Sequence, residues 1–333
     1  MTSYTPVELY EKLNDIFAQD DQIDELGLLD LSSLQDFGPN VVTYASDSKD
    51  GVAFVLTEHK LAISFWCIPL VFGYALKKFN VLWRQWRAAA PVSSPSVSAV
   101  VPPSVLLAKH RDEFLSLTRA LLLVNADHYT AWNMRKQLLM ATRKENQQDT
   151  LSAELRFLTL VFSKHPKSGE SWAHRRWVLG KLDVFSAASP PAPDDLVGSS
   201  CGCRFPGCHA LYDSALFKQE VKTAELSAEL YPKNYYAWTH LQWLAELLHC
   251  PSLVLAELRR MRKWTSTHVS DYCGFHQRQV LLLQYARAAA ALSQGTAPFP
   301  PSSSPTASKE ALDTRAGCNH NHQQLLLVPR SDE

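Results

Sequence analysis

A segment that recurs four times between residues 105 and 290 constrains the fold of this chain more than any other feature. Aligned on one aromatic position, the copies read DHYTAWNMRKQLL, KSGESWAHRRWVL, KNYYAWTHLQWLA and DYCGFHQRQVLLL. The aromatic residues are 40, 66 and 37 positions apart, and the 66 becomes about 41 once a low-complexity insert at 186–210 is left out. A period near 40 residues is typical of one helical hairpin per repeat. These aromatic residues are Trp132, Trp172, Trp238 and Phe275.

The residue four positions before each aromatic marks the start of a helix. These residues are His128, Ser168, Asn234 and Asp271. Three of the four carry a side-chain oxygen that accepts a hydrogen bond from a free backbone N–H at a helix start. Pro166 and Pro232 precede two of these caps and end the helix before. The sequence therefore predicts an all-α fold, an α-solenoid (superhelix) of antiparallel helical hairpins that bury their apolar faces against one another.

An arginine follows the aromatic by three positions in three of the four repeats, and Leu241 takes its place in the third repeat. Residues three apart share one face of a helix. We interpret the four aromatics as packing residues and the arginines as structural, with each guanidinium stacked on a Trp and bound to cap carbonyls of the next repeat. His174 and His240 have no Ser, Cys or Asp partner at a catalytic spacing and are also interpreted as structural. The arginines are Arg135, Arg175 and Arg278.

The rest of the chain divides into segments with different compositions. Residues 1–90 are predicted to form an irregular helical N-terminal region, which starts with the capping box of Thr5 and Glu8. Its uncharged run over 61–76 contains a proline and a glycine and is shorter than a membrane span, so we expect a buried helix there. Residues 91–104 read as a Pro/Ser linker, and 291–333 as a disordered tail.

Composition excludes several classes of function. The chain has 33 Lys and Arg and 33 Asp and Glu, which argues against a nucleic-acid binder held by positive charge. Neither of the glycine-rich nucleotide-binding signatures, GxGxxG and GxxxxGKS/T, occurs. The odd number of cysteines, seven, and a polar N-terminal segment without an apolar signal core favour a reducing, cytoplasmic location.

The sequence offers two candidate metal sites, a cysteine cluster in the insert and the weaker group of His320 and His322 near Cys318. Cys201, Cys203, Cys208 and His209 could together form a tetrahedral zinc site. Their spacing is unusual and the surroundings are rich in Gly, Pro and Ser, so we expect no metal in this chain and interpret the cluster as incidental. A zinc site remains the alternative.

The strings PKSGESWAHRRWVL and YPKNYYAWTHLQWL resemble the repeat of protein prenyltransferase α subunits, and the resemblance covers residues 105–290. It implies a crescent of hairpins around a β subunit that holds zinc, the isoprenoid diphosphate and most of the acceptor peptide. It also implies that Lys167 is catalytic and faces the diphosphate, with Tyr236 near the phosphates. Gly169 stands where the family pattern has a Tyr, which puts the catalytic geometry in question.

The resemblance implies a geranylgeranyltransferase of the third type, paired with the β subunit that otherwise serves Rab GTPases. Its acceptor would be a C-terminal cysteine of a membrane-trafficking protein. A non-catalytic helical-repeat scaffold for protein–protein interaction is the alternative, and it would have no need for a Lys before the helix cap.

Overall fold

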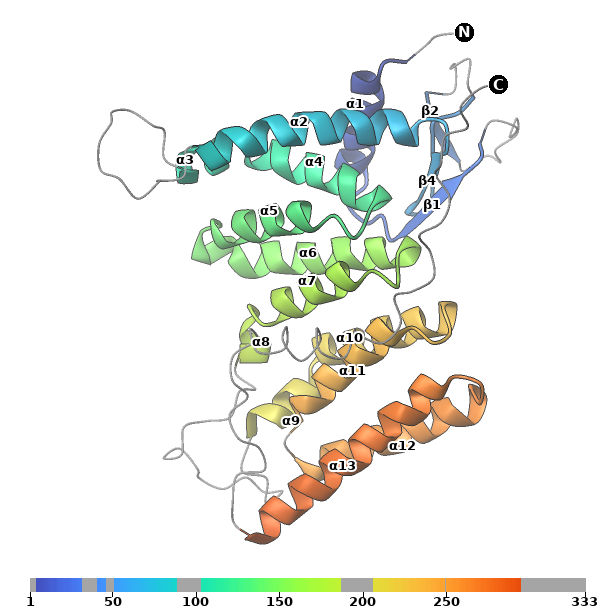
Figure 1. The fold of residues 1–333 in the computed structure, drawn as a ribbon, viewed down its shortest axis with the longest axis vertical. Helices are drawn as coiled ribbons and strands as arrows, with labels where there is room; N and C mark the ends of the chain where they lie inside the picture. The colour runs from blue at the N-terminus through green and yellow to red at the C-terminus, as the bar shows by residue number, and fades with distance from the viewer. Residues whose placement is uncertain are drawn as a thin grey trace, which may run out of the picture.

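The computed structural model describes residues 4–31, 41–45, 51–88, 103–186, 206–248 and 250–294. Within these residues, helices stack in layers along the long axis of an elongated molecule (Figure 1). Most of the predicted linker, of the insert and of the tail lies outside the described residues, and helix α3 (Pro103–Lys109) already begins within the predicted linker.

The N-terminal region contains both helices and strands. The prediction of a helical region over 1–90 is therefore wrong between residues 25 and 64, where four short strands form a sheet of order β1-β4-β3-β2. Strand β1 runs parallel to β4, and the other neighbours are antiparallel. The elements are α1 (Pro6–Gln19), β1 (Glu25–Leu29), β2 (Val42–Tyr44), β3 (Phe54–Thr57), β4 (Lys60–Ser64) and α2 (Ile68–Ala88).

The turn between β3 and β4 has a sequence that does not predict a hairpin. It consists of two residues, Glu58 and His59, both with positive φ (46° and 64°). Two-residue turns with positive φ usually contain Gly or Asn, and Glu and His are not typical of them. The expected helix over 61–76 is correspondingly a strand up to Ser64, and helix α2 starts only at Ile68. The capping box at Thr5 is confirmed.

Four antiparallel hairpins follow and confirm the predicted solenoid. They are α4/α5, α6/α7, α10/α11 and α12/α13, and α5, α7, α11 and α13 pack in succession. The helices from α3 on are α3 (Pro103–Lys109), α4 (Arg111–Val124), α5 (Tyr129–Met140), α6 (Lys144–Lys164), α7 (Gly169–Leu179), α8 (Asp183–Ser186), α9 (Pro206–Asp213), α10 (Ala215–Leu230), α11 (Tyr235–Glu246), α12 (Pro251–Thr267) and α13 (Tyr272–Gln294).

The predicted caps start the second helix of each hairpin. Ser168 Oγ accepts a hydrogen bond from the backbone N–H of Ser171, and the Asn234 side chain accepts one from Ala237. His128, not an oxygen-bearing residue, caps α5 in the same way through Nδ1. Because a satisfied N-terminus fixes where a helix begins, the caps place the Trp residues at equivalent positions in the stack.

The N-terminal region covers the first hairpin. Helix α2 lies between α1 and α4, and the ring of Phe79 in α2 meets that of Phe114 in α4 edge to face, with centroids 6.1 Å apart. Strand β1 lies at the C-terminal end of α6 (Figure 1), where Ser163 Oγ accepts a hydrogen bond from the Leu26 N–H. The sheet therefore lies beside the turn between α6 and α7.

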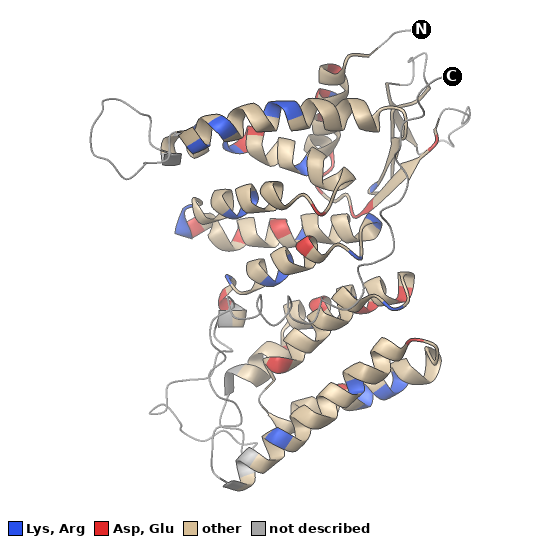
Figure 2. Cartoon of the chain, in the orientation of Figure 1, with Lys and Arg blue, Asp and Glu red and all other residues tan. Residues whose placement is uncertain are grey.

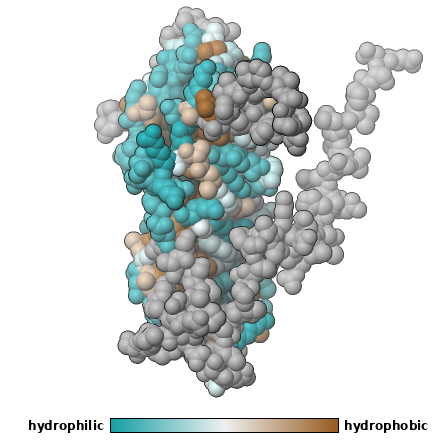
Figure 3. Space-filling model, turned by 90° about the vertical axis from the view of Figure 1, so that its left-hand side faces the viewer, coloured by the Kyte–Doolittle hydropathy of each residue, from teal (hydrophilic) through white to brown (hydrophobic). Residues whose placement is uncertain are grey.

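Charges of both signs are spread over the layers of the stack (Figure 2). The side of the molecule that Figure 3 shows is mostly hydrophilic where it is described, and its apolar spots are small and separate. No helix within the described ranges has both the length and the apolar composition needed to cross a bilayer.

Candidate functional site

Buried ion pairs join consecutive hairpins. Arg135 in α5 donates from Nε and Nη2 to the two carboxylate oxygens of Glu154 in α6, at 2.7 and 2.5 Å. Arg175 in α7 repeats the arrangement with Glu220 in α10, at 2.6 and 2.7 Å. A guanidinium and a carboxylate in this two-bond geometry make one of the strong hydrogen-bonded pairs found in proteins. The first and second repeats therefore each bind the following repeat through the same contact.

A histidine completes each pair. His174 Nε2 donates to Glu154 at 2.8 Å, and its ring lies on Trp132 of the preceding hairpin, with centroids 4.5 Å apart. His240 makes the same contacts, with Glu220 at 3.2 Å and with Trp172 at 4.9 Å. The prediction that these histidines are structural fits these contacts.

The burial of these groups shifts their pKa values. Burial by itself raises the pKa of Glu220, but Arg175 and His240 outweigh it and lower the pKa to about 2. Arg135 and His174 lower that of Glu154 to about 2 in the same way, against the opposing effect of burial. Burial lowers the pKa of His240 to about 4. At neutral pH, charged glutamates therefore face charged arginines and neutral imidazoles.

The partners predicted for Arg135 and Arg175 are wrong, because buried glutamates of the next repeat bind both guanidiniums. The guanidiniums lie over phenylalanines, Arg135 over Phe157 at 4.4 Å, and not over Trp side chains. Their carbonyl partners belong to their own hairpin, as with Arg175 and Leu155, and not to the next cap. The signal was present, since a Glu stands 18 positions before the aromatic in three repeats.

The third repeat lacks this Arg, and the fourth supplies a substitute. Glu257 stands 18 positions before Phe275, where Leu241 of the preceding repeat cannot pair with it. Arg260, one helical turn later, donates to the Glu257 carboxylate at 2.6 Å. The hydroxyl of Tyr212 donates to the same carboxylate at 3.1 Å. The buried carboxylate is thereby paired within its own helix.

The aromatic of the fourth repeat is not buried. Trp132, Trp172 and Trp238 are at most 2% exposed, and the first two donate from Nε1 to the carbonyls of Ala126 and Pro166. Phe275 is 43% exposed. Phe275 therefore occupies the same position in its repeat as the three Trp residues but is not packed as they are.

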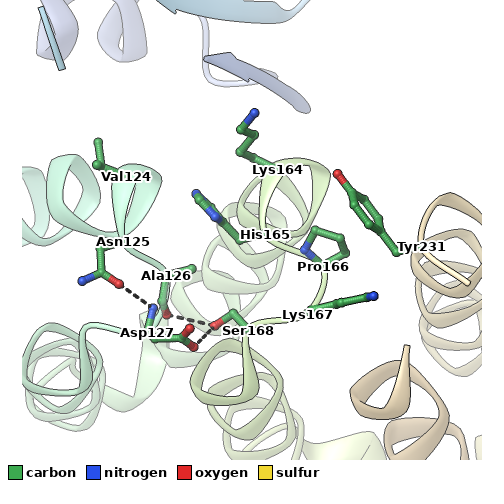
Figure 4. A pocket seen from close by; sticks show the side chains of 10 residues that line it. All are labelled: Val124, Asn125, Ala126, Asp127, Lys164, His165, Pro166, Lys167, Ser168 and Tyr231. Atoms are coloured by element: carbon green, nitrogen blue, oxygen red, sulfur yellow. Dashed lines mark hydrogen bonds between the residues drawn. The ribbon is translucent and has the colours of Figure 1, made fainter. Parts of the chain in front are cut away.

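A pocket opens at the turns that join the helices of the first two repeats. It has a volume of about 310 Å³ and is formed by the turn over 124–127 and the turn over 164–168, with Tyr231 from the next repeat (Figure 4). The carboxylate of Asp127 accepts a hydrogen bond from Ser168 at 2.7 Å. His165 bonds to the carbonyl of Leu123, and burial lowers its pKa, so its ring is neutral.

Two lysines supply the positive charge of this pocket. Lys164 and Lys167 both line it, and neither forms an ion pair with any residue in the described part of the chain. The ammonium of Lys167 is exposed and lies 6.0 Å from the centre of the Tyr231 ring. Lys233, one repeat later, lies in a similar way by Tyr272, at 5.5 Å, but outside the pocket. Lys167 is thus available to an anionic ligand.

Tyr236 occupies the space beside Gly169. A Cβ atom on Gly169 would lie 2.8 Å from Cε1 of Tyr236 and 3.2 Å from its hydroxyl oxygen. Real Cβ atoms do not come so close, so a side chain at this position would have to displace the exposed Tyr236 ring. The Tyr236 ring therefore lies beside Gly169, and its hydroxyl lies near the position where the tyrosine of the family pattern is absent.

Half of the cysteine cluster, Cys201 and Cys203, lies outside the described residues, whereas His209 lies in helix α9. Cys208 is described, and its side chain is fully buried in helix α9. His320 and His322 also fall outside. Among the residues that the structure places, no three His, Cys, Asp or Glu side chains gather as metal ligands would.

These features define a class, an α-solenoid of helical hairpins that are joined by buried Arg–Glu–His contacts. The chain belongs to the family of proteins built from the protein prenyltransferase alpha subunit repeat. The family model matches residues 111–142, 151–182, 217–248 and 254–285, which coincide with the four hairpins.

Two relatives carry the name protein prenyltransferase alpha subunit repeat-containing protein 1. The one from Danio rerio is 33% identical over 235 residues, which are 70% of this chain and 48% of the relative. The one from Homo sapiens is 34% identical over 235 residues, 68% of this chain and 49% of the relative. The human geranylgeranyl transferase type-2 subunit alpha is 25% identical over 177 residues, 52% of this chain and 26% of that protein. The chain spans about half the length of the first two.

Proposed function

We propose that this chain is the α subunit of a heterodimeric protein prenyltransferase, a geranylgeranyltransferase of the third type. Four consecutive repeats of the α-subunit family support the proposal, as does the similarity to an α subunit of a geranylgeranyl transferase. In this proposal the partner is the β subunit that also serves Rab GTPases. The complex transfers the isoprenoid from its diphosphate to a C-terminal cysteine of a membrane-trafficking protein, in the cytoplasm.

The observation that carries the proposal is the unpaired Lys167 ammonium in a pocket at the helix turns. Ser168 binds the Asp127 carboxylate of this pocket, and the Lys167 side chain extends away from Asp127, on the side where Tyr231 lies (Figure 4). A cation held in this way can bind the diphosphate of an isoprenoid that the β subunit presents.

The chemistry of the transfer explains what Lys167 contributes. Zinc in the β subunit would keep the acceptor cysteine as a thiolate, the nucleophilic form. The thiolate sulfur bonds to the first carbon of the isoprenoid while the bond from that carbon to the diphosphate oxygen breaks, so negative charge builds up on the departing diphosphate. Lys167 stabilises this charge, and the Tyr236 hydroxyl donates a hydrogen bond to it. Both groups act most strongly when the charge is largest, so they lower the barrier of the chemical step.

A second function has one observation in its favour. The relatives from Danio rerio and Homo sapiens are named for their repeats and not for an activity. A helical-repeat scaffold for protein–protein interaction would use the same stack of hairpins without transferring an isoprenoid.

Co-purification followed by a transfer assay separates the two functions. The chain is co-expressed with the Rab-type β subunit, and the complex is given labelled geranylgeranyl diphosphate and a protein acceptor with a C-terminal cysteine. The β subunit alone and the chain alone are the controls. Label that enters the acceptor only with the complex supports the enzyme. A complex that forms but transfers nothing, or a chain that binds no β subunit, contradicts it.

A further inference from the structure

The outer face of α13 carries the residues by which each earlier repeat binds the next. In the first three repeats the aromatic and the residue seven positions later are all buried: Trp132 and Leu139, Trp172 and Leu179, Trp238 and Ala245. In the fourth repeat the same two positions, Phe275 and Leu282, are 43% and 52% exposed. Tyr272 and Leu283 are exposed on the same side of the helix and extend the apolar stripe.

Arg278 holds the position of Arg135 and Arg175 but has no carboxylate. Its Nε is buried without a hydrogen-bond partner, and no ion pair joins its guanidinium to a residue that the structure describes. A buried donor without an acceptor costs free energy, which an incoming carboxylate would recover. The fourth repeat therefore presents both parts of the contact, the apolar stripe and the guanidinium.

The other end of the stack does not supply the missing partner. In the first hairpin, the residue 18 positions before the aromatic is Phe114, where the later repeats have a Glu. Phe114 is itself covered by Phe79 of α2. A second copy of the chain thus offers no free surface with a carboxylate at the matching position, which argues against head-to-tail assembly.

The charge of the last hairpin indicates the chemistry of the partner. Residues 251–294 contain six Lys or Arg and two Asp or Glu, although the whole chain is neutral. The ribbon of α12 and α13 is coloured mainly blue where it is charged (Figure 2). The two acids are already bound, Glu257 by Arg260 and Asp271 as the cap of α13. Four of the six basic residues belong to α12, so this charge attracts an acidic partner to the hairpin as a whole, and Arg278 is the cation that would bind it on α13.

We propose that the outer face of α13 binds an acidic amphipathic helix of another polypeptide. A glutamate of that helix pairs with Arg278 as Glu220 pairs with Arg175, and its apolar side covers Phe275 and Leu282. This surface is separate from the Lys167 pocket, and the inference does not depend on the proposed prenyltransferase activity.

The helix that binds the equivalent face of α7 in this chain provides a peptide for the test. Helix α10 packs on Arg175 through Glu220, so a fluorescent, side-chain-stapled peptide of residues 214–231 is the probe. We expect the full chain to bind it with a micromolar Kd, measured by fluorescence anisotropy. Arg278→Ala in the chain, or Glu220→Gln in the peptide, should weaken binding at least tenfold. Arg262→Ala, at an exposed arginine of α12, should change it less than twofold.

Two further variants keep the test independent of folding. Leu282→Ser changes an exposed side chain, so it should leave the unfolding midpoint unchanged. It should raise the Kd of the peptide at least fivefold. Arg278→Glu should bind a peptide with Glu220→Lys better than the original peptide. Equal binding by all variants overturns the proposal. So does a dimer that Leu282→Ser dissociates, because a second copy is then the occupant, or a tenfold gain in affinity on deletion of residues 295–333, because the chain then covers its own face.

Discussion

Arg175 and Glu220 are 45 positions apart in the sequence and form a fully buried, two-bond ion pair between the second and third hairpins. The pair spans the insert, so the two hairpins dock in register whatever the length of chain between them. His240 binds the same carboxylate from the other side. The contact therefore fixes the distance and the rotation between neighbouring repeats.

Removing one partner of this pair should destabilise the protein strongly. Arg175→Met leaves the Glu220 charge buried without its partner, which costs about 3–5 kcal/mol. The double variant Arg175→Met, Glu220→Leu should recover part of that loss. Urea unfolding followed by circular dichroism measures both. The control is Lys60→Ala, which breaks the exposed pair with Glu25 and should cost less than about 1 kcal/mol. Similar losses for Arg175→Met and Lys60→Ala would contradict the burial argument.

Acid should weaken the stack in two steps. The folded pKa of His240, about 4, lies below its ordinary value of 6.5, so between these values the unfolded chain takes up a proton that the folded chain does not. Stability is therefore lost as the pH falls from 6.5 to 4. Glu220, with a folded pKa of about 2 against 4.5, adds a loss between pH 4.5 and 2.

Urea midpoints at pH 7.5, 6, 5 and 4 measure the first step. We expect a continuous fall in the wild type and a smaller fall in His240→Gln, since glutamine does not titrate. Gln277 fills the equivalent position in the fourth repeat, so the substitution has a precedent in this chain. Replacing the exposed His59 by Gln serves as the control. An unchanged fall in His240→Gln would show that His240 does not carry this step.

Lys167 and Lys233 hold the same position in consecutive repeats and make a matched pair for the chemical step. In the complex with the β subunit, Lys167→Ala should slow single-turnover transfer by roughly 10- to 1,000-fold, because a fixed charge near the departing diphosphate is lost. Lys233→Ala should slow it less than about twofold. Unfolding midpoints should not change for either. Equal rates for both variants in an assembled complex would make this chain a structural support for its partner.

Gly169 and Tyr236 test how the missing tyrosine is replaced. Tyr236→Phe removes the hydroxyl and should slow transfer roughly tenfold. Gly169→Ala pushes the ring aside, because the new Cβ would lie 2.8 Å from it, and should slow transfer to a similar extent. The double variant should transfer the isoprenoid no more slowly than either single variant. Tyr235→Phe, at an exposed neighbour, is the control. Additive effects would mean that the two residues act independently.

Metal analysis of the purified chain tests the cysteine cluster. We expect less than about 0.1 zinc per chain, since Cys208 is buried in α9 and cannot reach outward as a ligand without leaving the core. Cys203→Ser should leave this value unchanged. One zinc per chain that disappears in Cys203→Ser would identify the cluster as a metal site.

The sequence by itself determined the repeat, its caps and the positions of its aromatics. These are local properties: a cap such as Ser168 binds an N–H three residues away, and Trp172 follows it at fixed helical spacing. Four copies in register repeat the same local signal, so the solenoid could be predicted.

The tertiary structure decided what depends on residues far apart in the chain. Strand β1 pairs with β4 across 35 positions, and a hairpin turn of Glu58 and His59 gives no sign of the sheet in advance. The exposure of Phe275 depends on what packs over it and not on its own place in the repeat. The contact of Tyr236 with Gly169 arises only because stacking brings two repeats together. Spacing along one helix fixes which face a residue lies on, but only the packing of the hairpins decides which side chain it meets there.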